Sequence, residues 1–461
     1  MRICTTDPLF PWDALEDSPS LKTLRCFLDA VPDGKLLDGL RQARGKGRND
    51  HPVAVLWGVV LLTIVLRHVT FEACLDELRR NHDLRQLLGI QEEQQVPDKW
   101  NVSRFLETLG QEPHLANLRE VFDLLAQRLG RALPELGTHS AGDATTLNGR
   151  AKKNADQLQS ETEQGLPQPS GGRKEYKDDD GHVTKVVEWF GYKLHLVVDV
   201  KHEISLGYRI TDTKAADQDV LPEVLNQARA NLPPCRIKTL AFDKAADDHE
   251  VHEFLHELHI KPVIQNRALW KDEPERSLGG RIPLHIVHDE AGTVFCYDQV
   301  SDPPVRHPMA CIGYEPDRET IKYRCPARHE GWTCPSDARC NDRKDYGLTA
   351  RIPCTLDLRR FPPIPRATKQ FERLYKGRTA VERINGRLKV FWGADDGHIV
   401  GSRRFHSFVG AVMVVHLGLA VVLASIPRWD GPLGKMRLSP IAQKLQEAEP
   451  AQPAAKPALV S

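Results

Sequence analysis

Three acidic residues stand where an α/β chain could bring carboxylates together. Asp143 lies inside a predicted strand (HSAGDATTL), Asp243 ends another (TLAFDKAAD), and Glu382 lies on a predicted helix. An aspartate inside a strand is disfavoured unless something pairs with it, and α/β proteins place their sites at the carboxyl ends of strands. Carboxylates from three separate elements supply the hard oxygen ligands that divalent cations prefer. The alternative is satisfied polar residues at strand ends.

The third carboxylate belongs to a string of polar residues in the segment YKGRTAVERINGRLK. At spacings of 3, 4 and 7 residues, this string holds Tyr375, Arg378, Glu382 and Lys389. At about 100° per residue, all four lie within a stripe of about 60° on a helix. The apolar residues of the neighbouring face should pack on a sheet, so Glu382 can point along its rim toward the strand ends. The alternative is a solvated face in which Arg378 and Glu382 form an ordinary i,i+4 pair.

These residues resemble the signature of the DDE transposases of bacterial insertion sequences. The Y-x2-R-x3-E-x6-K string, with Asp143 in a first strand and Asp243 ending a fourth, matches one branch of that family at every spacing. GYKLHLVVD (191–199) and DKAAD (243–247) also resemble the family's usual surroundings, although many relatives carry an aromatic residue where Ala246 stands. The resemblance covers roughly residues 40–425, including the helical N-terminal part.

The resemblance implies a ribonuclease H-like core that cuts DNA at the ends of its element and joins it to target DNA. Both reactions are in-line displacements at phosphorus, for which two Mg²⁺ (or Mn²⁺) ions stabilise the attacking and leaving oxygens. Asp143 would bridge both ions, and Asp243 and Glu382 would each serve mainly one. Without metal the carboxylates would repel one another, which raises the pKa of at least one.

The other residues of the string would bind DNA. Arg378 and Lys389 would hold phosphates and Tyr375 would stack or hydrogen-bond near the cut strand. Residues 359–404 contain twelve Lys or Arg and four Asp or Glu, an excess of +8 that suits a polyanion. The implied partners are the terminal inverted repeats, target DNA, and further copies of this chain in a synaptic complex.

Two other functions share these residues. A ribonuclease H-like nuclease that cuts without strand transfer would use the same metal site. A decayed copy that only binds DNA should lack an acidic residue, and all three are present.

A cluster of cysteines lies in the same half of the chain. Cys325, Cys334 and Cys340 are separated by eight and five residues, with His329 between the first two. Thiolates and imidazole in one small β domain could bind structural Zn²⁺. There is no C-x2-C knuckle, so reduced, packed cysteines are the alternative.

Composition excludes several classes of protein. Of 461 residues, 40% are hydrophobic and 27% are charged, which excludes a wholly disordered chain, a collagen and a small disulfide scaffold. The 63 basic and 63 acidic side chains cancel, but DNA affinity follows where Lys and Arg cluster. The start, MRICTTDPLF, has no basic region followed by an apolar stretch. We therefore expect no secretory signal, a cytoplasmic protein and reduced cysteines.

The pattern of elements predicts an α/β fold, namely a ribonuclease H-like mixed sheet with flanking helices, a β-rich insertion and an all-α N-terminal domain. Three strands in meander order, followed by alternating helix and strand, favour a mixed sheet. The expected helices of the core are 217–230, 247–259, 368–391 and 407–425, and the expected strands are 138–147, 187–200, 203–213, 238–243 and 261–265. The polar insert 149–183 is expected to be a loop or disordered.

These elements divide the chain into five segments. They are a helical N-terminal domain for DNA-end binding (1–132), the first part of the core (133–266), a Cys-rich β insertion (267–366), the second part of the core (367–426) and a flexible tail (427–461). The apolar run 407–425 is nearly long enough to cross a bilayer, but its small residues and central His416 favour a buried core helix and no membrane partner.

Several polar residues are expected to have local roles only. In the N-terminal domain, Asp50 and Pro52 should begin one helix and Thr70 should cap the next, which should end at Gly89. A basic loop is expected before Asp50, which leaves DNA binding and a plain interaction domain both open, and it holds Arg41, Arg44, Lys46 and Arg48. The remaining candidates are assigned to helix caps (Asp247, Asp248) or to structural positions (His195, His249, His252).

Overall fold

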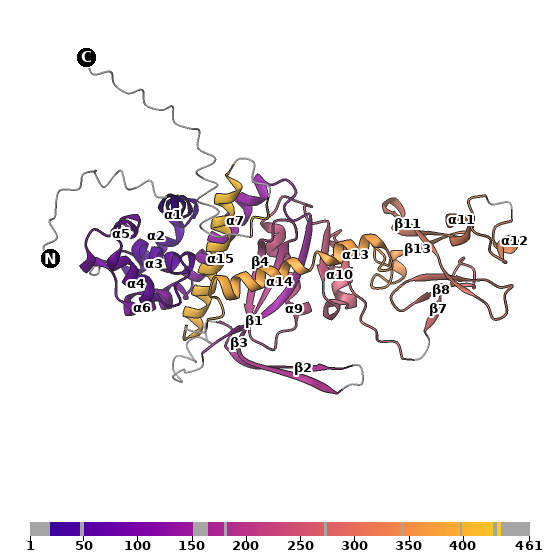
Figure 1. Ribbon diagram of the computed structural model, residues 1–461, viewed down its shortest axis with the longest axis horizontal. Coiled ribbons are helices and arrows are strands. Elements are labelled where there is room, and N and C mark those ends of the chain that lie inside the picture. Colours follow the sequence, from indigo (N-terminus) through magenta and orange to yellow (C-terminus); the bar gives the residue numbers. More distant parts are fainter. Residues whose placement is uncertain are drawn as a thin grey trace, which may run out of the picture.

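The protein is described by a computed structural model covering residues 19–46, 50–150, 165–178, 182–271, 274–342, 345–396, 399–426 and 431–434. Figure 1 shows three regions along the longest axis of the molecule. Helices of the N-terminal part lie at one end, a sheet lies in the middle, and a β-rich insertion forms the other end. Arg48 and most of the segment after residue 426 lie outside the described residues.

Seven helices make up the described N-terminal region. They are α1 (Pro19–Ala30), α2 (Gly34–Arg44), α3 (Val53–Val65), α4 (Phe71–Arg80), α5 (His82–Leu87), α6 (Lys99–Leu109) and α7 (His114–Ala132), with a 3-10 turn, η2 (Glu93–Gln95). Thr70 caps α4 as expected, accepting a hydrogen bond from the Ala73 N–H at 3.2 Å. The helix expected to continue to Gly89 is broken, because Asn81 accepts from the N–H groups of Asp83 and Leu84 and starts α5.

The start of α3 also differs from expectation. Pro52 itself holds the N-cap position and makes no side-chain cap, so Asp50 does not cap this helix. Arg41 and Arg44 belong to the last turn of α2, where cations suit the helix dipole, rather than to a loop. The basic loop predicted before Asp50 is therefore shorter than the sequence indicates.

The central sheet has the strand order of a ribonuclease H-like core, which confirms the predicted fold class. Its strands are β1 (His139–Asn148), β2 (Ser170–Lys177), β3 (Val183–Asp199), β4 (Ser205–Thr211), β5 (Thr239–Phe242) and β6 (Lys261–Ile264). The path runs β2-β3-β1-β5-β6. β4 pairs with the second half of β3, on the edge opposite β1. β1, β3 and β4 are antiparallel, whereas β1, β5 and β6 are parallel. Helices α9 (Asp217–Ala230) and α10 (His249–Glu257) provide the crossovers.

The polar insert does not stay wholly outside the sheet. Residues 170–177 form β2, which pairs antiparallel with the first half of the 17-residue strand β3. The prediction of a loop over 149–183 was wrong for this part, because paired extended backbone satisfies the hydrogen bonds of a polar segment as well as water does. Figure 1 shows the two strands leaving the sheet as a ribbon.

Past the insertion the chain returns to the core. The expected helix over 368–391 is divided into α13 (Lys369–Lys376), α14 (Thr379–Gly386) and a π-helical segment, η6 (Arg387–Phe391). The apolar helix α15 (Ser402–Ala424) follows. It is the one helix among the described residues that is long and apolar enough to cross a membrane, but 94% of its apolar window is buried inside the protein. The core-helix prediction is confirmed.

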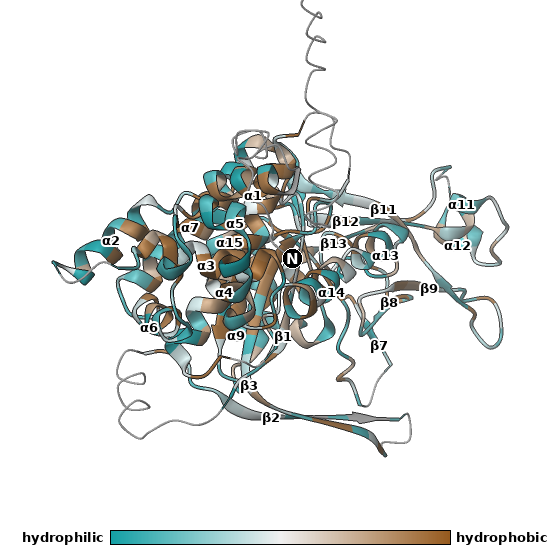
Figure 2. Ribbon diagram, turned by 60° about the vertical axis from the view of Figure 1, so that its left-hand side comes forward, coloured by the Kyte–Doolittle hydropathy of each residue, from teal (hydrophilic) through white to brown (hydrophobic). Residues whose placement is uncertain are grey.

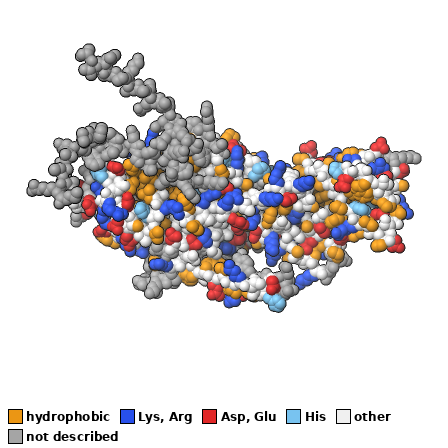
Figure 3. All heavy atoms as spheres, viewed as in Figure 1, with side chains coloured by type: hydrophobic (Ala, Val, Ile, Leu, Met, Phe, Trp, Pro, Cys, Tyr) orange, Lys and Arg blue, Asp and Glu red, His pale blue; other side chains and the backbone are white. Residues whose placement is uncertain are grey.

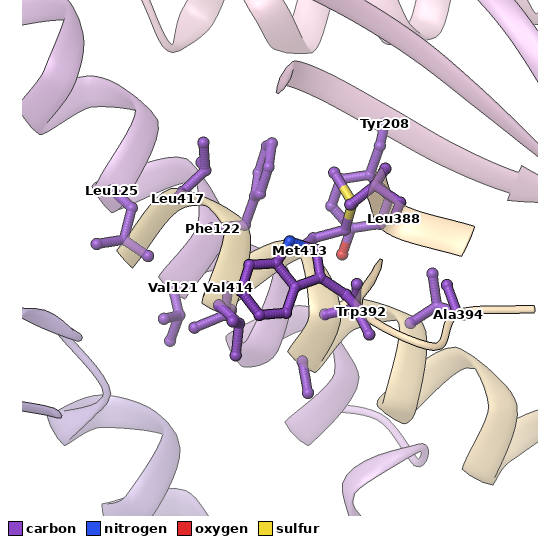
Figure 4. Close-up of a cluster of buried hydrophobic side chains, with 14 of the residues drawn as sticks. Val121, Phe122, Leu125, Tyr208, Leu388, Trp392, Ala394, Met413, Val414 and Leu417 are labelled. Carbon is purple, nitrogen blue, oxygen red and sulfur yellow. The ribbon is translucent and has the colours of Figure 1, made fainter. Parts of the chain in front are cut away.

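One hydrophobic core joins the N-terminal helices to the sheet. Figure 2 shows hydrophobic stretches concentrated where these helices meet the sheet, with hydrophilic stretches toward the outside. In the close-up of Figure 4, Phe122 of α7 and Met413 of α15 lie beside Tyr208 of β4, and Leu388 of η6 joins the same cluster. The π-helical segment η6, which ends the helix expected over 368–391, is therefore packed into the hydrophobic core.

The insertion is β-rich, as predicted, and has a second core. Its strands are β7 (Glu275–Ser277), β8 (Ile286–Asp289), β9 (Val294–Tyr297), β10 (Arg306–Pro308), β11 (Ala310–Glu315), β12 (Thr320–Arg324) and β13 (Thr349–Pro353). They form a four-stranded sheet, β10-β9-β8-β7, and a three-stranded sheet, β11-β12-β13. Two short helices, α11 (Pro326–Glu330) and α12 (Asp337–Cys340), lie at the tip farthest from the central sheet in Figure 1.

Candidate active site

Asp143 and Asp243 occupy equivalent positions on neighbouring parallel strands. β1 and β5 pair with Ala141 opposite Ala241. Asp143 lies two residues further along β1, and Asp243 lies two residues beyond Ala241, directly after β5. Gly142 permits this approach, because a Cβ at that position would meet the ring of Phe242 at 2.3 Å. The aspartates therefore meet at the edge formed by the carboxyl end of β5, as the sequence predicts.

The segment that carries Glu382 lies over this edge of the sheet. α13 packs against β5 and β6, while α14 packs against β1 and β3. Thr368 caps α13 by accepting from the Phe371 N–H at 3.2 Å. At the break, Gly377 is close to Val200, and a Cβ there would meet a Val200 methyl group at 2.9 Å. The break therefore lets the helix follow the sheet from β5 to β1.

Arg378 links two of the three predicted carboxylates. Its Nη2 donates to Glu382 Oε1 at 2.6 Å, and its Nη1 lies 3.6 Å from Asp143 Oδ2. The i,i+4 pair with Glu382 thus exists, but it is not an isolated surface pair. The Arg378 side chain is 22% exposed and that of Glu382 is 51% exposed, so Glu382 stays accessible to solvent.

Asp143 has the electrostatics expected of crowded carboxylates. Burial raises its pKa to about 6; the Ala144 N–H and Arg378 oppose this rise, whereas the nearby charges of Asp243 and Asp217 add to it. Asp217 was not among the predicted site residues. It begins α9 and pairs with Lys193 at 2.7 Å, so no signal in its own segment marks it. The charges of Asp243 and Asp217 therefore both act on Asp143 at this edge of the sheet.

Tyr375 lies within the same electrostatic neighbourhood. Burial raises the pKa of its phenol, the Arg378 guanidinium lowers it, and the charges of Asp243 and Glu382 raise it. Its ring stacks on that of Phe371 with centroids 5.7 Å apart, which fixes its direction on α13. Tyr375 is therefore near enough to both Asp243 and Glu382 for their charges to act on its phenol.

Lys389 is placed differently from the other residues of the string. Its Nζ donates to the Thr146 carbonyl oxygen at 2.6 Å and lies 3.1 Å from the Asp395 carboxylate. Asp395 in turn accepts from the Asn148 N–H at 2.5 Å. Lys389 therefore ties η6 to β1, three residues beyond Asp143, and its contact with DNA stays a prediction.

The basic run 359–404 is largely used inside the protein. Its pairs with acidic side chains outside the central site are Arg359–Asp247, Arg366–Asp247, Arg360–Asp357, Lys376–Glu372, Arg383–Glu203, Arg387–Glu203, Lys389–Asp395, Arg403–Glu107 and Arg404–Glu107. Figure 3 shows Lys and Arg side chains interspersed with Asp and Glu along the viewed face. The excess of +8 in the sequence therefore overstates the charge that this segment offers to DNA.

Asp247 is the buried centre of an ion-pair network, not the helix cap that the sequence predicts. The cap of α10 is Asp248, which accepts from the Glu250 N–H at 3.0 Å. The Asp247 side chain is 0% exposed and lies 2.8 Å from Arg359 and 2.9 Å from Arg366. These arginines lie at the end of the insertion, more than 100 residues further on, so their role could not be assigned from the DKAAD segment alone.

The same carboxylate also contacts the start of the insertion. It accepts from the Arg267 N–H at 2.8 Å, and His252 Nε2 lies 3.1 Å from it. Burial alone would raise the pKa of Asp247, but the hydrogen bonds from His252, Arg359 and Arg267 lower it to about 2. Both ends of the insertion are therefore held to the turn that follows Asp243.

The two candidate metal sites have suitable donor atoms without ligand geometry. In the part of the chain that the structure describes, no three His, Cys, Asp or Glu side chains are arranged to hold a metal ion. The donor chemistry of the carboxylate site nevertheless fits a divalent cation, since the oxygens are hard and come from separate elements. Burial, followed by the charges of Asp243 and Asp217, raises the pKa of Asp143. Zinc at Cys325, Cys334 and Cys340 stays a prediction.

Comparison with known protein families decides the family of the chain. A model described as "Transposase DDE domain" matches residues 137–417, which is more than half of the chain. The chain belongs to the transposase DDE domain family. A second model, "Transposase domain (DUF772)", matches residues 13–108 of this transposase, within its helical N-terminal region.

The family fixes the general activity. A DDE transposase cleaves DNA, transfers strands and uses divalent metal ions, and this transposase has the matching core. No curated protein matches the chain. Among solved structures, a piggyBac transposase synaptic complex with hairpin DNA, determined by cryo-EM, has 10% identity and a TM-score of 0.32, covering 95% of this chain and 86% of that one. That likeness is too low to transfer structural detail.

Proposed function

We propose that Asp143, Asp243 and Glu382 form the site with which this transposase cuts the ends of its own element and joins them to target DNA. The observation that carries the proposal is the convergence on Arg378. This guanidinium contacts both Asp143 and Glu382. By the register of β1 and β5, Asp143 and Asp243 lie at equivalent positions beside each other. The carboxylates thus come from β1, the end of β5 and α14, three elements that the core holds in place.

These three residues would hold Mg²⁺, which would supply Lewis-acid stabilisation for the attacking and leaving oxygens of an in-line displacement. Arg378 then has a second task. While it neutralises Asp143 and Glu382 it limits their repulsion, and when they bind cations it is free to turn to a phosphate.

The DNA-binding residues follow from this arrangement. Arg378 and Tyr375 lie directly beside the carboxylates, and Lys389 supports β1 from η6. We assign recognition of the terminal inverted repeats to the helical N-terminal region, and we expect more than one copy of the chain to hold two ends in a synaptic complex. Membership of the branch with the Tyr, Arg, Glu, Lys string rests on the spacings of that string.

Strand transfer separates this function from that of a simple nuclease. Purified protein should join a pre-cut end, carrying a free 3′-hydroxyl, to unrelated target DNA in the presence of Mg²⁺ or Mn²⁺. Products should be mapped by sequencing across the new junctions. Cleavage of intact ends without any joining of pre-cut ends would favour the nuclease instead.

Replacement of Arg378 with alanine should weaken DNA-end binding and reduce its salt dependence by about one counterion. The reason is its place beside the carboxylates, where a phosphate must lie if they bind the catalytic cations. Binding constants measured over a series of salt concentrations give the slope directly.

Lys201→Ala provides the matched control for this measurement. Lys201 pairs with Glu135 and its side chain is 66% exposed, in the turn that follows β3 at the opposite end of β1 from Asn148. The Lys201→Ala substitution also removes one positive charge, but at a position away from the site, so the salt dependence of DNA binding should stay at the wild-type value. Equal slopes for the Arg378→Ala variant and the wild type would show that Arg378 does not contact phosphate.

A further inference from the structure

Four cysteines of the insertion face one small cavity. Cys296 comes from β9, Cys325 precedes α11, Cys334 lies in the loop between the two short helices, and Cys340 ends α12. All four line a cavity of about 20 Å³. Cysteines in the described part of the chain form no disulfide, so these thiols are free.

The positions of the neighbouring histidines and of the two remaining cysteines show which side chains of the insertion can reach the cavity. His329, which lies between two of the cysteines in sequence, does not line the cavity, whereas His285 does. His285 Nε2 lies 3.6 Å from the Cys340 sulfur. Cys354 is buried instead in the apolar core of the insertion, and Cys311 packs against that core. The fold therefore sorts the six clustered cysteines into four at the cavity and two in packing positions.

The four sulfurs are neighbours, because all four cysteine side chains line this one small cavity. Four thiols kept as thiols gain little from such crowding, because each is a weak hydrogen-bond donor and acceptor. A cation that converts them to thiolates would turn the same crowding into ligation.

The described tip of the insertion has polar contacts, such as the Arg328–Asp337 pair, but little apolar core of its own. The apolar core of the insertion is built chiefly from its β-strands, while α11 and α12 have five and four residues. Helices this short are not stable by themselves. Small lobes with little core commonly depend on a structural metal or on disulfides, and the cysteines of this described lobe form no disulfide.

We propose that Cys296, Cys325, Cys334 and Cys340 bind one structural Zn²⁺ ion that fastens α11 and α12 to the four-stranded sheet. His285 lies outside the ligand set and donates a hydrogen bond to the Cys340 thiolate, as second partners of zinc sites commonly do. The four sulfurs are not at ligand distance in this structure. The sulfur positions depend on rotation about the Cα–Cβ bonds, and a cavity of about 20 Å³ has room for one small ion.

The metal content of the full-length protein tests this proposal. Protein purified from zinc-supplemented medium should carry about one zinc per chain by elemental analysis. Cys296→Ser and Cys325→Ser should each lower the zinc content at least fivefold, and Cys311→Ser, a cysteine of the same lobe outside the cavity, should leave it unchanged. His285→Ala should keep the zinc.

Each contrary outcome overturns a defined part of the proposal. Zinc below about 0.2 per chain in the wild type, or an equal loss in Cys311→Ser, would leave packed thiols as the better account. Loss in Cys325→Ser and His285→Ala but not in Cys296→Ser would replace Cys296 with His285 as a ligand. None of these measurements depends on DNA cleavage, so they stand or fall separately from the transposase site.

A second measurement needs no variant. Removing the metal from the wild-type protein with a chelator should expose four additional thiols to a maleimide reagent under native conditions. Substituting Co²⁺ should give the intense sulfur-to-metal absorption of a thiolate site. An unchanged thiol count after chelation, with no such absorption, would contradict the proposal even if the serine variants fail to fold.

Discussion

Replacing Glu382 with glutamine should lower DNA-end cleavage by about a thousandfold or more and leave end binding near its wild-type level. The amide keeps the length of the side chain but loses its charge, so it is a poor ligand for Mg²⁺. Cleavage depends on charge stabilisation at both reacting oxygens, and the loss amounts to on the order of 4 kcal/mol. Binding should hold, because removing an anion near phosphate lessens repulsion.

Glu372→Gln is the matched control for this prediction. Glu372 forms an i,i+4 pair with Lys376 at 2.8 Å, as Glu382 does with Arg378, but its side chain is 66% exposed. The charges that act on it are those of Lys376 and Lys369, not those of the site carboxylates. Such a solvent-exposed pair contributes little to stability, so cleavage should be unaffected. If Glu382→Gln behaves like this control, with cleavage within about tenfold of wild type, Glu382 is only a structural partner of Arg378.

Replacing Asp247 with alanine should lower the free energy of unfolding by about 3–5 kcal/mol. The substitution leaves the Arg359 and Arg366 guanidinium groups buried without their carboxylate, and it frees both ends of the insertion from the turn after Asp243. Denaturant unfolding followed by tryptophan fluorescence measures the change. A second substitution, Arg366→Met, should recover part of the lost stability, because it removes one of the orphaned charges.

The surface pair of Glu315 and Arg351 provides the comparison. Glu315 accepts from Arg351 at 2.8 Å in the same insertion, but its side chain is 30% exposed, so Glu315→Ala should lower the free energy of unfolding much less than Asp247→Ala does. Equal losses for the two variants would mean that burial adds nothing to the Asp247 network.

The Asp247 network also predicts an acid response. The pKa of this carboxyl is about 2 in the folded protein, below its ordinary value. Its contribution is therefore complete above about pH 4 and is lost as the pH falls toward 2. Between pH 4 and pH 2 the wild type should lose more stability than Asp247→Asn does.

The fold and the convergence of the aspartates could be predicted because they depend on local patterns. Alternating strands predicted β1 and β5, and parallel strands bring their carboxyl ends to one edge, so Asp143 and Asp243 were expected together. Helical spacing placed Arg378 beside Glu382, as the structure has it. Lys389 lies in the π-helical segment that begins at Arg387, where the angle between successive side chains differs from that of an α-helix, and its contact with DNA stays a prediction.

Other features could not be predicted because they depend on residues far apart in sequence. Asp247 has the sequence context of a helix cap, and its partners Arg359 and Arg366 stand more than 100 residues further on, at the end of the insertion. Asp217 reaches the site only through the packing of α9 on the sheet. The count of basic residues over 359–404 could not show that Glu203 and Glu107, from distant segments, pair with some of them and neutralise part of their charge.

Joint removal of the three carboxylates tests the central claim most directly. Cleavage of end DNA should be measured at saturating protein and Mg²⁺ for Asp143→Asn, Asp243→Asn, Glu382→Gln and the triple variant. If the carboxylates hold the catalytic cations together, each single variant should already fall to the same low rate, and the triple variant should be no slower within about tenfold. A single variant that keeps a rate near wild type, or losses that add up across the three positions, would show that they do not form one site.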